Sequence, residues 1–328
     1  MKKAAALFLI LIGISSNAQS YPPEAGVAGS TAIFKESADF KAWATGIEVT
    51  RGYLKKSDPN FSIGGNNKAT AGSPSDALGF PDGNTVSLGD EGNATLTFAS
   101  PIINGDGFDF AVFENGGPTY LELAFVEASS DGVHFFRFPA HSQTQTQTQI
   151  GPFGTPSATY LNNLAGKYSA QYGTPFDLSE LPDDDFLDKN NITHVRIIDV
   201  VGSIDPEFAT FDSFGNAVNE SYPTPFASCG FDLQAVGVIH QRTLGLNDNL
   251  LQAISVYPNP ATDYICINSE KQLRATLFDN EGSIVIEKDI DKNQKIPVSQ
   301  LKSGVYFLRL ALDDAEASGE IHKKIIIK

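Results

Sequence analysis

Residues 105–138 read GDGFDFAVFENGGPTYLELAFVEASSDGVHFFRF, and this stretch decides the fold class. Apolar residues at every second position of 108–112 predict a strand with one apolar face. The glycine- and proline-rich run at 115–118 predicts a turn, after which the alternation resumes in a second strand at 121–126. Asp131-Gly132 forms the centre of a predicted hairpin turn, and a third strand follows at 133–138. We therefore expect an antiparallel β protein.

Similar patterns cover the rest of the chain. Strands are predicted at 94–98, 195–201 and 229–240, and a short helix capped by Ser37 is predicted over 37–44. With 29 glycines, 18 prolines and about eight strands, residues 19–240 predict a large antiparallel jelly-roll sandwich. The polar segment 241–252 is interpreted as a linker. Five further strands within 253–328 predict a small Ig-like β-sandwich, so the chain is expected to be all-β.

The first 18 residues have the pattern of a secretory signal peptide. Lys2 and Lys3 precede an apolar run at 4–14, and small residues follow at Ser16 and Ala18. The apolar run is too short to remain as a membrane anchor, and no later stretch is long enough to form a transmembrane helix. We expect cleavage after Ala18 and export from the cytoplasm.

Charge is concentrated in the larger predicted domain. The whole chain carries −16, and residues 19–252 hold 11 Lys and Arg against 28 Asp and Glu, a net charge of −17. Because no basic stripe is present to bind phosphates, nucleic acid is not an expected partner. The acidity fits either a solvated surface or a set of oxygen ligands for Ca²⁺. Cys229 and Cys266 fall in different predicted domains, and both a disulfide and two free buried thiols remain open.

Three motifs near the C-terminus share one resemblance. SVYPNPATD at 255–263, LKSGVYFLRL at 301–310 and KKIIIK at 323–328 resemble the type A C-terminal sorting domain of the type IX (Por) secretion system. The resemblance implies export across the outer membrane of a Gram-negative bacterium to the cell surface. Its implied partners are the secretion machinery, a sortase-like enzyme that removes the domain, and the surface lipopolysaccharide to which cargo is attached. The sorting-signal residues carried over from the motifs are Pro258, Asn259, Pro260, Gly304, Tyr306, Lys323, Lys324 and Lys328.

The larger domain carries two further resemblances. VEASSDGVHF at 126–135 resembles the strand-turn-strand of galactose-binding-like (discoidin-like) β-sandwiches. Segments such as DFAVFENG at 109–116 and GFDLQAVGVI at 230–239 are similar to a family of uncharacterised bacterial cell-surface proteins. That family implies surface location and no established activity.

Calcium is the best-supported hypothesis for a site. Asp106, Asp109, Glu114, Asp199 and Asp212 fall in or beside predicted strands and their turns, where Ca²⁺ could gather oxygen ligands. Two of them, Asp109 and Asp199, interrupt apolar runs in which an unpaired carboxylate is unfavourable. The alternative is that these carboxylates cap turns or pair with Arg196 and Lys167.

Function is predicted from fold analogy and from the absence of catalytic motifs. The chain contains no nucleophile elbow, zinc-binding His-Glu-x-x-His helix or phosphate loop, so no catalytic residue is proposed. We expect a surface-displayed, non-catalytic protein that binds a glycan or another surface ligand, with a possible structural Ca²⁺. The alternatives are a secreted carbohydrate-active enzyme, which would need two carboxylates, and a purely structural surface protein.

Overall fold

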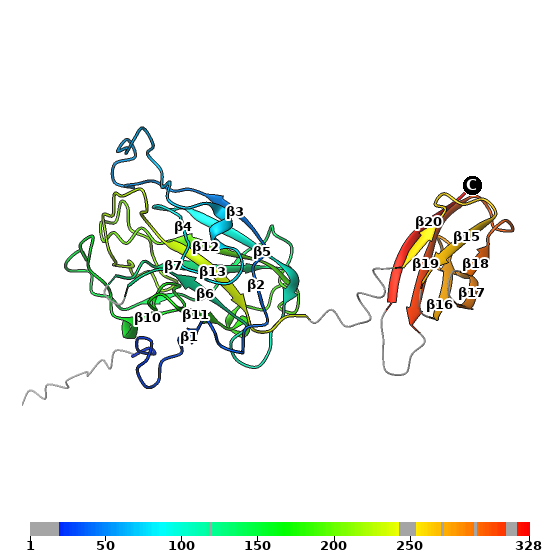
Figure 1. The fold of residues 1–328 in the computed structure, drawn as a ribbon, viewed down its shortest axis with the longest axis horizontal. Helices are drawn as coiled ribbons and strands as arrows, with labels where there is room; N and C mark the ends of the chain where they lie inside the picture. The colour runs from blue at the N-terminus through cyan, green and yellow to red at the C-terminus, as the bar shows by residue number, and fades with distance from the viewer. Residues whose placement is uncertain (1–19, 118–119, 243–253, 270–271, 292–293, 313–319) are drawn as a thin grey trace, which may run out of the picture. The chain divides into compact units, whose positions relative to one another are not determined.

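The computed structural model describes residues 20–117, 120–242, 254–269, 272–291, 294–312 and 320–328. The chain divides into two compact units, a main unit up to Arg242 and a C-terminal unit from Thr243 (Figure 1). Both are built of antiparallel strands, so the all-β expectation is confirmed. The predicted signal peptide and most of the predicted linker lie outside the described residues.

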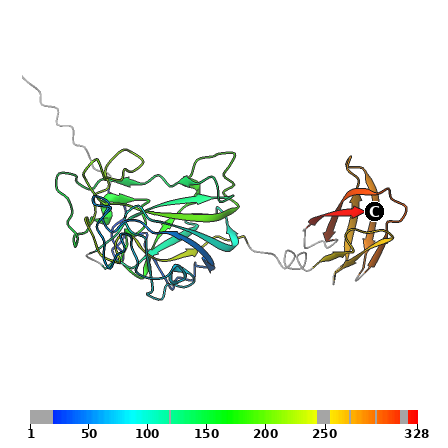
Figure 2. The ribbon, with the colours of Figure 1, turned by 90° about the horizontal axis from the view of Figure 1, so that it is seen from above.

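The main unit contains two large sheets, which Figure 2 shows from a second direction. The six-stranded sheet has the order β1-β11-β6-β13-β2, with β4 pairing with β13, and the five-stranded sheet has the order β3-β5-β12-β7-β8. Strands of the first are β1 (Ile33–Phe34), β2 (Ala42–Trp43), β4 (Val86–Ser87), β6 (Phe110–Glu114), β11 (Tyr172–Phe176) and β13 (Asp232–Val238). Strands of the second are β3 (Gly46–Thr50), β5 (Asn93–Ile102), β7 (Ala124–Ser129), β8 (Phe136–Arg137) and β12 (Ile192–Asp199). Shorter elements are β9 (His141–Ser142), β10 (Leu161–Asn162) and the 3₁₀ turns η1 (Pro74–Ala77), η2 (Ala158–Tyr160) and η3 (Leu178–Glu180).

The principal core lies between these two sheets. Phe110 and Val112 of β6 pack with Val126 of β7 and with Val195 and Ile197 of β12 in one buried cluster. Since side chains alternate across a pleated sheet, the intervening β6 residues point the other way. Those residues enter a second cluster that covers the opposite face of the six-stranded sheet, which contains Ala111, Phe113, Ala235, Phe40 and Trp43. The strand β6 is therefore buried on both faces.

The stretch that predicted the fold contains three strands, but two details of the prediction are wrong. Strands β6 and β7 do not pair, because β6 belongs to the six-stranded sheet and β7 to the five-stranded sheet. Residues 121–123 precede β7 without being part of it, and Glu122 is buried rather than facing solvent. Residues 115–117 thus begin a connection between the sheets instead of closing a hairpin, and position 118 of the predicted turn lies outside the described residues.

The predicted helix over 37–44 is also wrong. The backbone amide of Asp39 donates to the Ser37 hydroxyl at 3.3 Å, so the serine stabilises a turn and not a helix start. Two residues later, the Lys41 amide donates to the Val238 carbonyl at 2.8 Å. The chain therefore joins the edge of the six-stranded sheet as β2, and Trp43 packs on Phe113 with ring centroids 5.5 Å apart.

The C-terminal unit is a smaller sandwich of two sheets. Their orders are β14-β15-β18 and β17-β16-β19-β20. The strands are β14 (Ser255–Tyr257), β15 (Tyr264–Asn268), β16 (Leu273–Phe278), β17 (Ile284–Ile290), β18 (Gln294–Pro297), β19 (Gly304–Leu312) and β20 (Glu320–Ile327). Ile265, Ile267, Leu277, Leu308 and Ile325 belong to a single buried core, so both sheets contribute to it.

Two open questions from the sequence are answered by the fold. Cys229 and Cys266 are both free and buried, one in each unit. No helix in the described part of the chain is long and apolar enough to cross a membrane.

Candidate functional site

A groove on the main unit lies on the outer face of the five-stranded sheet. Val195 and Ile197 of β12 point into the core, so His194 and Arg196 point outward by the two-residue period. The same rule turns Thr95 and Thr97 of β5 outward. The groove that results has a volume of about 480 Å³. It is lined by Gly46, Ile47, Glu48, Thr95, Thr97, Gly132, Phe135, His194 and Arg196.

Strand register places the polar groups of this groove in rows across the sheet. Glu48 of β3 stands opposite Thr95 of β5, which stands opposite Arg196 of β12, and Glu127 of β7 follows. The next row contains Thr97 beside His194. Directly opposed side chains in a sheet are close enough to interact, so the rows form a continuous polar surface.

Arg196 is held rigidly at the centre of this surface. Its Nε donates to Glu127 Oε2 at 2.8 Å, and its guanidinium carbon lies 3.8 Å from the centroid of the Phe135 ring. The other oxygen of Glu127 accepts from Arg137 Nε at 3.0 Å, and the Arg137 guanidinium covers Phe125. An arginine fixed by a carboxylate and an aromatic face presents its remaining N–H groups in a defined direction.

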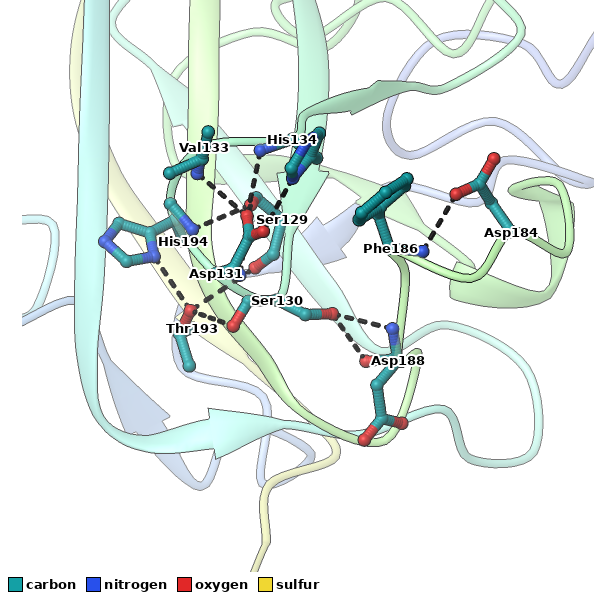
Figure 3. A network of polar contacts seen from close by, with 11 residues as sticks. Ser129, Ser130, Asp131, Val133, His134, Asp184, Phe186, Asp188, Thr193 and His194 are labelled. Atoms are coloured by element: carbon teal, nitrogen blue, oxygen red, sulfur yellow. Dashed lines mark hydrogen bonds and ion pairs between the residues drawn. The ribbon is translucent and has the colours of Figure 1, made fainter.

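The rim of the groove is a turn stabilised by Asp131 (Figure 3). Asp131 Oδ1 accepts from the backbone amides of Val133 and His134 at 2.8 Å each, and its other oxygen contacts His134 Nδ1 at 2.7 Å. Hydrogen bonds from His134 hold the pKa of Asp131 below its usual range. Gly132 has a φ of +75°, and a Cβ there would lie 2.8 Å from the His194 ring. Glycine is therefore required for the turn to approach His194 closely.

The same turn is joined to the neighbouring loop and strand (Figure 3). The Ser130 hydroxyl donates to the Asp188 carbonyl at 2.9 Å and accepts from the Asp188 amide at 2.8 Å. On the strand side, Thr193 Oγ1 lies 2.8 Å from His194 Nδ1. The His194 ring is thus oriented by its own neighbour, and the rim is fixed on both sides.

The carboxylates predicted as calcium ligands occupy separate places in the main unit. Asp109 is fully buried and accepts from the amides of Gly105 and Leu178, both at 2.7 Å, and contacts His240 Nδ1 at 2.8 Å. Glu114 accepts from the Gly116 amide at 2.6 Å. Both therefore cap backbone groups, the role that the alternative interpretation gave them.

The other three predicted ligands are equally dispersed. Asp199 accepts from the amides of Phe231 at 2.7 Å and Glu91 at 3.1 Å. Asp212 accepts from the Ser142 amide at 2.7 Å and from two amides of its own loop. Asp106 is exposed in the turn before β6. None of the five pairs with Arg196, which binds Glu127, and Lys167 makes no ion pair among the described residues.

Two of these carboxylates belong to a larger buried acidic cluster. Within the described residues, no group of three or more His, Cys, Asp or Glu side chains is arranged to hold a metal ion, so bound Ca²⁺ stays a prediction. Burial raises the pKa of Asp90 to about 7 and that of Asp232 to about 6. Burial, and after it the charge of neighbouring carboxylates, raises the pKa values of four more buried carboxyl groups well above their usual values. These groups are Glu114, Glu122, Asp199 and Glu220. The buried acidic cluster contains Asp90, Glu114, Glu122, Asp199, Glu220 and Asp232.

In the C-terminal unit, the three sequence motifs come together around β20. Asn259 Nδ2 donates to the Lys324 carbonyl at 2.8 Å, and its Oδ1 accepts from the Ile326 amide at 2.9 Å. On the other side of β20, Gly304 and Tyr306 of β19 pair with Ile327 and Ile325. The first and second motifs therefore flank the third. Pro258 and Pro260 adjoin Asn259, and Lys323 and Lys328 belong to the third motif.

Comparison with known proteins identifies the smaller unit. Residues 255–328 match the family of secretion system C-terminal sorting domains. This segment is a type IX C-terminal sorting domain. The chain is accordingly a secreted or cell-surface protein, and its sorting domain implies the secretion machinery as a partner.

The remaining comparisons are partial. Beta-agarase D from Zobellia galactanivorans is 36% identical over 77 residues, which are 23% of this chain and only 15% of that protein. A β-glucuronidase from Ruminococcus gnavus is 13% identical with a TM-score of 0.25, covering 94% of this chain and 48% of that one. The β-glucuronidase of Parabacteroides merdae is 8% identical with a TM-score of 0.24, over 87% and 36%. The chain thus spans less than half the length of each of these three proteins.

Sequence reasoning missed the groove altogether. Its residues come from β3, β5, β12 and the β7–β8 turn, which are far apart in the chain. The available signal was the polar half of each alternating strand, such as Thr95 and Thr97 or His194 and Arg196. That signal shows which face is outward, but only the register shows that those faces adjoin.

Proposed function

We propose that this secreted protein uses its main unit to bind a glycan, without catalysis, in the groove on the five-stranded sheet. The observation that carries the proposal is the arrangement of Phe135, Arg196 and His194 around one hollow. An aromatic ring supplies an apolar surface, and the charged and hydroxyl groups beside it supply directional hydrogen bonds. At about 480 Å³, the groove falls within the size range of ligand pockets, about 300–1,000 Å³.

The composition of the groove favours binding over hydrolysis. Glycoside hydrolysis generally uses two carboxyl groups flanking the bond to be broken. Glu48 is the one carboxylate among the described residues that line the groove. Both oxygens of the adjacent Glu127 are engaged in ion pairs, one with Arg137 and the other with Arg196. A carbohydrate-active enzyme and a purely structural surface protein are the competing proposals.

We further propose the partners that accompany a sorting domain of this type. The secretion machinery would bind the C-terminal unit, a sortase-like enzyme would remove it, and surface lipopolysaccharide would receive the released main unit. A structural Ca²⁺ in the main unit belongs to the same set of proposals. The net negative charge of the unit supports the ion, whereas the dispersed positions of Asp109, Asp199 and Asp212 give it no shared coordination site.

The groove proposal is tested with a panel of polysaccharides. Purified protein is assayed by affinity electrophoresis against agarose, laminarin, xylan, alginate and polygalacturonate. At least one is expected to retard it. Phe135→Ala should weaken that binding about three- to tenfold, because an aromatic contact contributes about 0.5–1.5 kcal/mol. The matched control is Phe153→Ala, since Phe153 is 76% exposed and does not line the groove.

Each outcome separates the competing functions. Binding of the polysaccharide in the groove is supported if Phe135→Ala reduces the retardation and Phe153→Ala leaves it unchanged. Release of reducing sugar from any member of the panel would replace binding by catalysis. No retardation and no release by the intact protein would leave a structural surface role as the better account.

A further inference from the structure

A second, smaller pocket lies in the main unit, away from the residues that form the groove. Its volume is about 130 Å³, well above the space that a single water molecule needs. Strand β11, the turn η3 and the segment that follows β10 contribute its polar lining. Its lining includes Phe108, Asn163, Lys167, Thr174, Pro175 and Glu180.

The hydroxyl of Thr174 is the first sign that this pocket receives a ligand. Thr174 is only 3% exposed, yet its Oγ1 has no hydrogen-bond partner. Its neighbour two positions on, Phe176, lies in the principal core, so Thr174 shares the inward-facing side of β11. A buried polar atom without a partner is unfavourable and calls for an explanation such as a missing ligand.

Lys167 supplies a second buried polar group to the same pocket. It is 4% exposed, and its Nζ donates to the Leu161 carbonyl at 2.8 Å and to the Pro22 carbonyl at 3.3 Å. An ammonium has three N–H donors, so one is left over from these two bonds. Burial lowers the pKa of Lys167 to about 8, which leaves the amine mostly protonated at pH 7.

Charge in the pocket is balanced rather than of one sign. Glu180 also lines it, and its carboxylate accepts a hydrogen bond from the side-chain amide of Asn163. A small anion would be repelled by Glu180, and a small cation would be repelled by Lys167. A hydroxyl group both donates and accepts, so neighbouring hydroxyls can satisfy an ammonium and a carboxylate together. Phe108 and Pro175 provide an apolar wall for the carbon skeleton.

We propose that this pocket binds a small neutral polyhydroxylated group, in which hydroxyls bond to Thr174, Lys167 and Glu180. The group could come from a free polyol or from the terminal sugar of a longer chain, because both present the same vicinal hydroxyls. The site is distinct from the groove and does not depend on it, since the two share no lining residue.

The test uses saturation-transfer NMR on the full chain with three probes. Myo-inositol represents a free polyol, methyl β-D-galactopyranoside represents a terminal sugar, and acetate represents a plain anion. One or both neutral probes are expected to bind, and the stronger one identifies the source. Thr174→Val should weaken that binding about tenfold or more, because it removes one hydroxyl and retains the shape of the side chain.

The melting temperature of the Thr174→Val variant provides a second measurement. In the absence of a ligand, Thr174→Val should leave the melting temperature unchanged or raise it, because the lost hydroxyl had no partner. Lys167→Met should weaken binding of the neutral probe as well. The matched control is Thr276→Val, which removes another buried, unpartnered hydroxyl, in the C-terminal unit, and should leave binding unchanged.

Three results would contradict binding of a polyhydroxylated group in this pocket. The proposal would be overturned if Thr174→Val left binding of the neutral probes unchanged, or if acetate bound preferentially. It would also be overturned if neither neutral probe bound. The Phe135→Ala groove variant should bind the neutral probe as the wild type does. Failure of the groove proposal and failure of this one are therefore distinguishable.

Discussion

The side-chain oxygen of Asn259 accepts a hydrogen bond of 2.9 Å from the backbone amide of Ile326, 67 residues further along the chain. The Asn259 amide nitrogen donates in turn to the Lys324 carbonyl. A single side chain thus bridges alternate residues of β20. Two residues after Asn259, the backbone of Ala261 pairs with the backbone of Ile327.

Removal of this bridge should loosen the final strand. Asn259→Ala is expected to lower the local stability of β20 by about 1–2 kcal/mol, because two hydrogen bonds are lost at a partly solvated site. Hydrogen exchange of residues 320–327 in the full chain should become about tenfold faster. Glu281→Ala, in an exposed turn of the same unit, is the control. Unchanged exchange in β20 would show that the bridge is dispensable.

Exposed lysines at the last strand of the sorting domain allow recognition by the secretion machinery to be tested separately from folding. Lys324 and Lys328 are exposed on or beside β20, an edge strand. Lys324→Glu with Lys328→Glu should reduce the amount of protein at the cell surface several-fold and leave the melting temperature nearly unchanged. Lys288→Glu, on the opposite edge strand β17, should do neither. Normal surface display of the double variant would show that this basic edge is not recognised.

The buried acidic cluster predicts that the main unit loses stability as pH rises. The folded-state pKa values of Asp90, about 7, and Asp232, about 6, lie above those of an unfolded aspartate, about 3.9. Their stabilising contribution is therefore complete below pH 4 and is lost as pH rises to 7, by up to about 1.4 kcal/mol per pH unit for each group. Urea unfolding at pH 5 and pH 8 should show greater stability at pH 5. Equal stability at both would indicate that these groups ionise normally.

Urea unfolding at pH 8 also tests whether the main unit binds Ca²⁺. A cation bound among these carboxylates would keep them ionised and would restore at pH 8 the stability lost on ionisation. Addition of millimolar Ca²⁺ at pH 8, followed by EDTA, shows whether this happens. A reversible rise in stability would place the ion in the cluster, and no change would remove calcium from the description of this protein.

Asp109 should matter for stability whether or not calcium is present. Asp109→Ala leaves the amides of Gly105 and Leu178 and the His240 ring without their partner, which is expected to cost about 2–4 kcal/mol. The neighbouring exposed residue supplies the control, because Asp106→Ala should change stability by less than about 0.5 kcal/mol. Urea unfolding in EDTA measures both. A loss seen only when Ca²⁺ is added back would favour a ligand role for Asp109.

Independent folding of the two units is also open to direct test. We propose that residues 19–240 fold alone, because the main unit has its own two-sheet core and the sorting domain has another. Limited proteolysis of the intact protein should cut first within the segment 241–252. Cleavage first inside either sandwich, or a single cooperative unfolding transition of both, would contradict this division.

Sequence patterns predicted the C-terminal unit better than the main unit for a physical reason. The strand β16 at Leu273–Phe278 is one of the five strands predicted within 253–328, because Leu273, Ala275 and Leu277 are buried on one face and alternate with the exposed Arg274. Its neighbour β17 follows closely in the chain. In the main unit, Leu121 to Phe125 are buried on every side, so alternation of residue type no longer marks the strand boundary. The helix predicted at 37–44 does not form because Lys41 bonds to Val238, almost 200 positions away.

The candidate site was less predictable than the fold. Composition located the acidic residues but not their partners, and Asp109 gained His240 from the far end of the domain. The groove depends on Thr95 facing Arg196 across a strand pair, and the pocket depends on Pro22 reaching Lys167. Contacts of this kind arise from long-range register, which a single sequence does not encode in a local pattern.

The position of β20 has a consequence for biosynthesis. Asn259 and Ala261 obtain their partners from residues 324–328, so the sorting domain acquires its native edge only after that segment has been synthesised. A chain that stops short of β20, through a nonsense codon or a stalled ribosome, would carry the earlier motifs without the strand they flank. Only a chain that has been synthesised through residue 328 can therefore hold the three motifs together.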